Sequence, residues 1–239
     1  MARILSASET VFPLAETFTI SRGSRTEART VTVEVRDGDR AGHGESVPYA
    51  RYDETVDGVI AEIMALQEAI AAGLDRAALQ QALPGGAARN ALDCALWDLE
   101  ARQSGRRAYE IAGLASPGPV ETAFTLSLEA PDVMREKAQK NAHRPLLKIK
   151  LGGEGDLARL EAVRAGAPDA AIIVDANEGW SPAIYAELAP ELIRLGVKMV
   201  EQPLPAGADA ALAERERSLP VCADESCQDR ASLPDMIGK

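Results

Sequence analysis

The sequence predicts an α/β protein in which an α+β segment, residues 1–115, precedes a run of βα units, residues 116–239. Three observations support this fold class. The first segment contains strands with period-two alternation, followed by helical stretches. From about residue 120 the order changes, and strand-like and helical runs alternate with strand centres about every 25 residues. The run at 172–174 is apolar without alternation, which is typical of a parallel strand buried on both faces.

The first segment is predicted to form strands over residues 17–20 and 29–36, where polar and apolar residues alternate. Asp37-Gly38, between these strands and Gly42-His43-Gly44, is a turn signal of the hairpin type. Two helices are expected, over 54–72 and 87–103, because Gly73 and Gly105 stop the helical pattern. One buried helix face is indicated by residues at helical spacing, namely Ala88, Leu92, Ala95, Leu96 and Leu99.

The second segment is predicted to contain five βα units. Strands are expected at 122–128, 146–151, 171–175, 198–201 and 220–223, with helices that include 156–165 and 183–195. A closed eightfold barrel needs about 200 residues or more. The sheet is therefore open, or the chain stops before a barrel closes.

Net charge, the length of apolar runs and the number of cysteines limit the kinds of partner that this chain can have. The 239 residues carry 37 acidic and 26 basic side chains, a net charge of −11, so a phosphate backbone or an anionic membrane would be repelled. No apolar run approaches the ~18 residues of a membrane span, and the N-terminus lacks the apolar core of a signal peptide. Three cysteines favour a reducing cytoplasm over a disulfide framework. We expect a small-molecule partner, no nucleic acid and no membrane, and a homo-oligomer stays open.

Three acidic residues stand at the carboxyl ends of three successive predicted strands: Asp175, Glu201 and Asp224. Neighbouring strands lie ~4.8 Å apart, so these carboxylates are expected to converge at one edge of the sheet. Three such charges would repel one another without a cation, and hard oxygen ligands favour Mg²⁺. Taken singly, each acid could instead be an N-cap or first-turn residue of the following helix.

Lys148 and Lys150 lie two apart on the strand at 146–151, so both side chains share one face. Burying two lysines requires charge partners, and the acids supply them. Mutual repulsion and burial would lower the proton affinity of one lysine, which could then act as a neutral base. A lysine base beside Mg²⁺ is the equipment for removing a proton α to a carboxylate, a pattern known from enolase-type enzymes. The alternative is an edge strand with two solvated lysines.

These residues resemble the muconate-lactonising subgroup of the enolase superfamily. The resemblance lies in the order and spacing of four motifs, at 148–150, 175–177, 201–203 and 224–226. Further strings at 20–25, 44–52, 87–98 and 222–227 are similar to those of bacterial L-Ala-D/L-Glu (dipeptide) epimerases. The resemblance implies an α+β capping domain, residues 1–115, and a modified (β/α) barrel, residues 116–239.

The same resemblance implies roles for individual residues. Lys150 would be the base, and Lys148 would contact the substrate carboxylate and tune Lys150. Thr125 would contact the substrate, and Arg25 would pair with a glutamate side-chain carboxylate. Arg22 and a merely solvated Arg25 are the alternatives. The metal would be Mg²⁺, held by Asp175, Glu201 and Asp224.

The implied activity is Mg²⁺-dependent epimerisation of L-Ala-D/L-Glu-type dipeptides in murein peptide turnover, by α-proton abstraction and an enediolate. Epimerisation needs a second base, which the family carries on a sixth strand, and no residue up to Lys239 matches it. We therefore expect the sequence to be a fragment or to omit a tail. Other functions left open are a cycloisomerase, a dehydratase, or an inactive truncated module that binds a metal and carboxylates.

Overall fold

The structure is a computed structural model and describes residues 2–213 and 219–237. Its contacts divide the chain into two units: unit 1 is Met1–Leu14 with Glu27–Pro119, and unit 2 is Ala15–Thr26 with Val120–Lys239. The predicted division at residue 115 lies near the junction at Pro119. Assignment of Ala15–Thr26 to unit 2 was not predicted. The division into a capping domain and a barrel domain stays a prediction.

The sheet of the first segment has three strands in the order β1-β2-β3: β1 (Ile4–Ile20), β2 (Gly23–Asp37) and β3 (Arg40–Ser46). β2 and β3 pair antiparallel from Val31↔Ser46 to Asp37↔Arg40, on either side of the predicted turn at Asp37-Gly38. Alternation on β2 directs Val31, Val33 and Val35 into the core of unit 1. The strand expected at 17–20 is the end of the much longer β1.

The helices of unit 1 follow in sequence. They are the short 3₁₀ helix η1 (Ala50–Tyr52), α1 (Val56–Met64), α2 (Gln67–Ala71), α3 (Arg76–Ala82), α4 (Ala87–Ser104) and α5 (Ala108–Ile111). The prediction of one continuous helix over 54–72 is wrong, because a turn at Ala65 and Leu66 separates α1 from α2. α4 matches its prediction, and the five residues predicted for its buried face all lie in the core.

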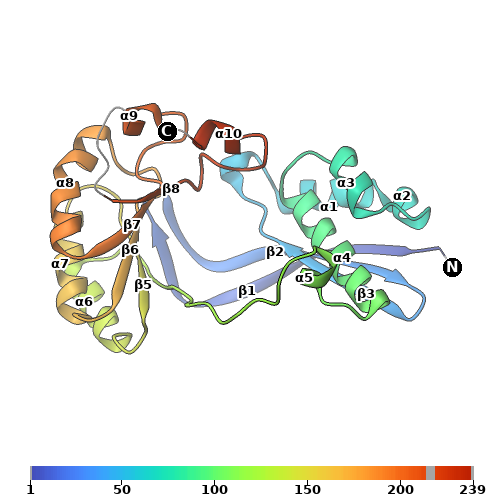
Figure 1. The fold of residues 1–239 in the computed structure, drawn as a ribbon, viewed down its shortest axis with the longest axis horizontal. Helices are drawn as coiled ribbons and strands as arrows, with labels where there is room; N and C mark the ends of the chain where they lie inside the picture. The colour runs from blue at the N-terminus through green and yellow to red at the C-terminus, as the bar shows by residue number, and fades with distance from the viewer. Residues whose placement is uncertain (1, 214–218, 238–239) are drawn as a thin grey trace. The chain divides into compact units, whose positions relative to one another are not determined.

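β3 and α4 approach each other closely at two glycines. A Cβ on Gly42 would lie 2.1 Å from the carbonyl oxygen of Ala95, and one on Gly44 would lie 2.0 Å from that of Ala91. Only a residue without a side chain allows the two backbones to come so near. These glycines therefore act in packing between a strand and a helix (Figure 1).

Unit 2 contains the five predicted strands in one parallel sheet, in chain order: β4 (Phe124–Leu126), β5 (Leu146–Lys150), β6 (Ala171–Asp175), β7 (Val197–Glu201) and β8 (Val221–Cys222). Between them run α6 (Pro131–Lys140), α7 (Asp156–Gly166), α8 (Pro182–Arg194) and α9 (Ala210–Ala213), and α10 (Leu233–Met236) follows β8. The predicted α/β class, with an α+β first segment and five βα units, is confirmed.

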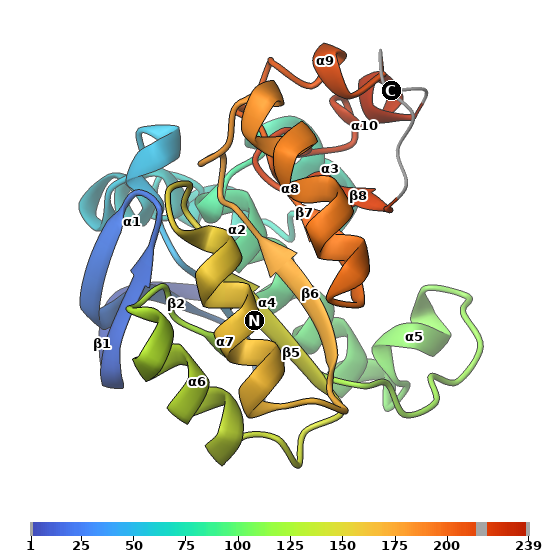
Figure 2. The same cartoon turned by 90° about the vertical axis from the view of Figure 1, so that its left-hand side faces the viewer.

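Helices α6, α7 and α8 lie along one face of β5, β6 and β7 (Figures 1 and 2). Leu147, Ile149 and Leu151 point to this face and are buried in the core of unit 2. Lys148 and Lys150 therefore point to the other face, as period two requires. In the described part of the chain, every helix is too short or too polar to cross a membrane.

Candidate active site

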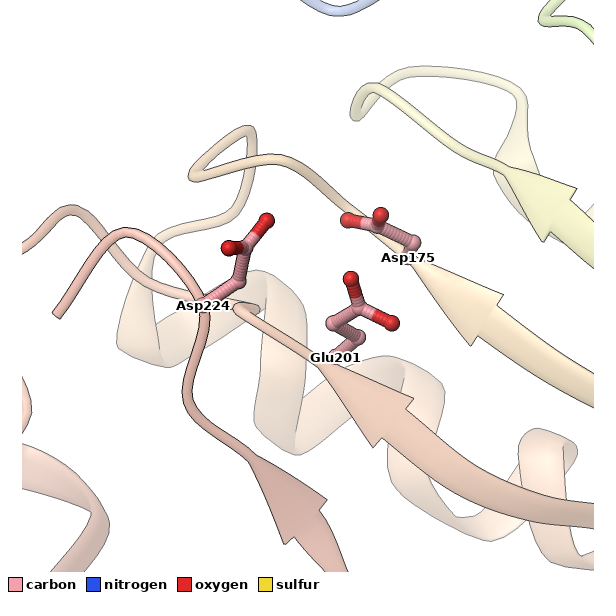
Figure 3. A group of neighbouring side chains, drawn as sticks. All are labelled: Asp175, Glu201 and Asp224. Atoms are coloured by element: carbon pink, nitrogen blue, oxygen red, sulfur yellow. The ribbon is translucent and has the colours of Figure 1, made fainter. Parts of the chain in front are cut away.

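The three predicted acids lie together at the carboxyl ends of the strands. Asp175 ends β6, Glu201 ends β7, and Asp224 follows β8 by two residues. The sheet register pairs Asp175 with Glu201 and Glu201 with Cys222, which brings the three strand ends level. One carboxylate oxygen of each acid lies within 4.8 Å of the others, and the three side chains point toward one another (Figure 3). We call these three residues the acid cluster.

Both lysines of β5 reach the acid cluster. Lys150 Nζ donates to Asp175 Oδ2 at 2.5 Å and to Asn177 Oδ1 at 2.9 Å. Lys148 Nζ lies 2.6 Å from Glu201 Oε1 and 3.0 Å from the same oxygen of Asp175. β5 lies between β4 and β6, so the alternative of an edge strand with solvated lysines is wrong.

Burial and the neighbouring charges oppose each other at this site. Burial raises the pKa of Asp175, but Lys150 and Lys148 outweigh it and hold that pKa below its ordinary value. Burial lowers the pKa of Lys148, but the hydrogen bond to Glu201 and the charge of Asp175 raise it above its ordinary value. The expected fall in proton affinity is therefore not found at Lys148, because the two acids outweigh the effect of burial on its pKa.

The other two acids have raised pKa values. Burial raises the pKa of Glu201, and the charge of Asp175 adds to this against the effect of Lys148. Burial, Glu225 and Asp175 together raise the pKa of Asp224. Within residues 2–213 and 219–237, the Asp224 side chain has no ion-pair partner. A hard cation among the three carboxylates would supply the missing positive charge, so this donor set could hold a metal ion.

Asn177 is a site residue that the motif analysis did not single out as functional. It has a left-handed backbone with φ of 44°, which Asn tolerates better than most residues. Its backbone N–H donates to Asp175 Oδ1 at 2.9 Å, and its side-chain oxygen accepts from Lys150. Its position two residues after a strand-end acid was the one available signal.

Gln202, the residue after Glu201, fixes the loop that carries Asp224. Its side-chain oxygen accepts from the backbone N–H groups of Asp224 and Ser226, at 2.9 and 3.1 Å. Its amide nitrogen donates to Ser226 Oγ at 2.8 Å. Gln202 also has a positive φ, 33°, which is strained for a residue with a side chain.

The remaining predicted residues have different surroundings. Thr125 on β4 pairs in register with Lys148, so both side chains lie on the site face of the sheet. Arg25 is exposed, and its guanidinium carbon lies 5.5 Å from the ring centroid of Phe18. Arg22 lies 2.6 Å from Glu225 Oε1. The structure thus brings the two lysines and the acid cluster together, while Arg25 contacts an aromatic ring.

Two domain families together match most of the chain. Residues 5–113 match the N-terminal domain of mandelate racemase and muconate lactonizing enzyme. Residues 133–239 match the enolase C-terminal domain-like family.

Curated proteins and solved structures agree with this match. The L-Ala-D/L-Glu epimerase of Escherichia coli (strain K12) is 45% identical over 239 residues, which cover 99% of this chain and 74% of that protein. An enolase family member from Agrobacterium tumefaciens with homology to dipeptide epimerases, solved with bound sodium, L-Ala-L-Glu and an ordered loop, is 50% identical. It has a TM-score of 0.95, covering 99% of this chain and 72% of that one.

A third similar protein was solved with a divalent metal. The dipeptide epimerase of Enterococcus faecalis V583, complexed with Mg and the dipeptide L-Leu-L-Tyr, is 26% identical with a TM-score of 0.89. The match covers 99% of this chain and 72% of that one.

Proposed function

Because this chain belongs to the enolase superfamily, in the mandelate racemase and muconate lactonizing enzyme family, we propose that it is a dipeptide epimerase acting on L-Ala-D/L-Glu. The 45% identity to an epimerase of this name supports the reaction class. The observation that carries the proposal is the contact between Lys150 and Asp175, because it puts an amine and the acid cluster at one end of one sheet.

Asp175, Glu201 and Asp224 are proposed as the residues that hold Mg²⁺. Their oxygen chemistry suits this ion, and a solved dipeptide epimerase with the same fold was complexed with Mg. When bound, the ion would supply positive charge that stabilises negative charge on the substrate carboxylate.

Lys150 is proposed to remove the α-proton of the second residue of the dipeptide, in its neutral amine form. The electron pair left on the α-carbon spreads into the neighbouring carboxylate, where positive charge is needed. Lys148, on the same face of β5, would contact that carboxylate with its ammonium group. Thr125 lies beside Lys148 in register and is proposed as a further substrate contact.

Arg25 is proposed to read the glutamate side chain of the substrate. It is exposed, and its cation–π contact with Phe18 is weak at a solvated site, so the guanidinium is free to exchange this contact for a carboxylate. The residue that returns a proton on the opposite face is not assigned among residues 1–239. We propose a cytoplasmic role in turnover of murein peptides, since the three cysteines are free thiols.

Proton exchange with solvent tests the proposal. In D₂O, NMR would follow deuterium entering the α-carbon of L-Ala-L-Glu and of L-Ala-D-Glu separately. Lys150→Ala should stop exchange from one epimer and spare exchange from the other, with a loss of about 10²–10⁴-fold. Lys140→Ala, which removes an exposed lysine of α6, is the matched control. A Lys150→Ala protein that interconverts both epimers at the normal rate would contradict the assignment.

The same experiment separates the alternatives. An enzyme of the dehydratase type would eliminate water from its own substrate and give no α-deuterated dipeptide. A module that only binds metal and carboxylate would bind the dipeptide without any exchange.

A further inference from the structure

We infer that Glu225 is a positioning residue that docks the segment 20–25 through Arg22 and, through Asn177, orients Lys150. The inference rests on the proposed function only for the role of Lys150. Arg22 and Glu225 belong to unit 2, as do all residues of the argument. Glu225 was not predicted as a site residue, and Arg22 was predicted only as an alternative to Arg25.

Arg22 is committed to the site loops by several contacts. Its Nη2 lies 2.6 Å from Glu225 Oε1, and its Nη1 lies 3.0 Å from Glu178 Oε2. Nη1 also donates to the backbone oxygen of Asn177 at 2.8 Å, and Ser21 Oγ donates to that same oxygen at 2.8 Å. Two neighbouring residues of the turn between β1 and β2 are thus fixed on the loop that follows β6.

Glu225 links this docked segment to the candidate base. Its Oε1 accepts from Asn177 Nδ2 at 3.3 Å as well as from Arg22. Asn177 Oδ1 accepts from Lys150 Nζ at 2.9 Å. The two ends of the Asn177 amide therefore point in opposite directions, the oxygen to the Lys150 amino group and the nitrogen to the Glu225 carboxylate. In this orientation the amide oxygen faces a donor and the amide nitrogen faces an acceptor.

The Glu225 carboxylate is unusual because it is buried but incompletely satisfied. The residue is 2% exposed, and among the described residues its Oε2 has no hydrogen-bond partner. Such a group is costly unless a positive charge compensates it, and Arg22 supplies that charge from a segment far away in sequence. Undocking the segment would leave the carboxylate uncompensated. Docking is therefore favoured by Glu225, and the Asn177–Lys150 contact is fixed by the same oxygen.

Trypsin provides a readout of docking that does not depend on activity. Trypsin cleaves the peptide bond after an arginine whose side chain enters its specificity pocket, and an arginine held in an ion pair cannot do so. Glu225→Gln keeps the size of the side chain and leaves both arginines of the segment in place. Cleavage of the full chain after Arg22 and Arg25 should become about tenfold faster or more, the effect of losing a hydrogen bond to a charged group. Glu191→Gln, which weakens a solvated ion pair of α8, is the matched control and should leave these rates unchanged.

Two substitutions of Arg22 keep the test decisive if Glu225→Gln folds poorly. Arg22→Met should speed cleavage after Arg25, and Arg22→Lys, which keeps the positive charge, should restore part of the protection. The effects of Arg22→Met and Glu225→Gln on that cleavage should not add, because each breaks the same pair.

Dipeptide α-proton exchange tests the link to Lys150. Glu225→Gln should lower kcat for exchange about tenfold, because the Lys150 amino group is held less firmly in position. It should also raise KM, because the segment 20–25 is no longer held against the site. Cleavage at the wild-type rate would overturn the inference, and so would faster cleavage with unchanged kcat. A wild-type chain that exchanges no α-proton would refute the proposed function instead, and the cleavage rates would still decide whether Glu225 docks the segment.

Discussion

Removing the carboxylate of Asp156 should strongly destabilise unit 2. Asp156 is the first residue of α7 and is 2% exposed. It accepts from the backbone N–H of Gly153 at 2.6 Å, from that of Gly152 at 3.0 Å and from Trp180 Nε1 at 2.7 Å, and Arg159 lies 3.0 Å away. These contacts join the loop after β5 to the loop after β6.

The size of the effect follows from the donors that would lose their acceptor. Asp156→Ala leaves the two half-buried glycine N–H groups and the buried Trp180 indole N–H without their carboxylate, at about 1–3 kcal/mol for each donor that finds no other acceptor. Water can enter a cavity of this polarity and recover part of the loss, so we expect about 3–5 kcal/mol in the free energy of unfolding. Asp156→Asn keeps one acceptor oxygen and should lose about half as much.

Urea unfolding followed by tryptophan fluorescence measures this loss. Trp180 is 1% exposed and bonded to Asp156, so its emission reports on the region that the substitution disturbs. Glu161→Ala, on the solvated side of the same helix, is the control and should change the unfolding midpoint little. An Asp156→Ala protein that loses less than about 1 kcal/mol, with an unchanged slope, would refute the reasoning.

Three further results are expected. Converting any member of the acid cluster to its amide should weaken Mg²⁺ binding by at least about 10–100-fold in calorimetry, with the circular dichroism unchanged, and undiminished affinity in all three variants would remove the cluster as a metal site. Arg25→Ala should reduce exchange of L-Ala-L-Glu about 10–100-fold more than exchange of dipeptides with an apolar second residue, and equal losses would mean that Arg25 does not read the side chain. Gly44→Ala should lower the stability of unit 1 by about 1–3 kcal/mol or more in thermal unfolding, because its Cβ would meet backbone of α4, whereas Gly118→Ala, which has open space, should not.

The sequence alone predicted the acid cluster and the lysine pair because both depend on local pattern. An acid that ends an apolar strand is visible in sequence, and parallel strands place their ends together. Alternate side chains of a strand point to the same face, so the spacing of Lys148 and Lys150 on β5 predicted that both lie on one face of the sheet. The same logic predicted five βα units and the buried face of α4.

The remaining features depend on contacts between distant residues. Glu225 meets Arg22 across 203 positions and Asn177 across 48, and no local pattern marks either pair. The break between α1 and α2 falls at Ala65 and Leu66, which carry no turn signal of the glycine or proline kind. The strand that became β1 was predicted only at 17–20, because residues 4–16 show no clear alternation of polar and apolar side chains. Most of β1 is at least partly exposed, so burial does not impose such a pattern on it.

The distribution of the acid cluster over three βα units has a consequence for folding. Its members are separated by 26 and 23 residues, so no single unit can gather the three carboxylates. They meet only after β6, β7 and β8 have paired in register, which requires contacts between residues more than 20 positions apart. A ligand that requires all three is therefore a ligand of the native state alone. By mass action such a ligand, once in excess over its dissociation constant, would raise the melting temperature with the logarithm of its concentration.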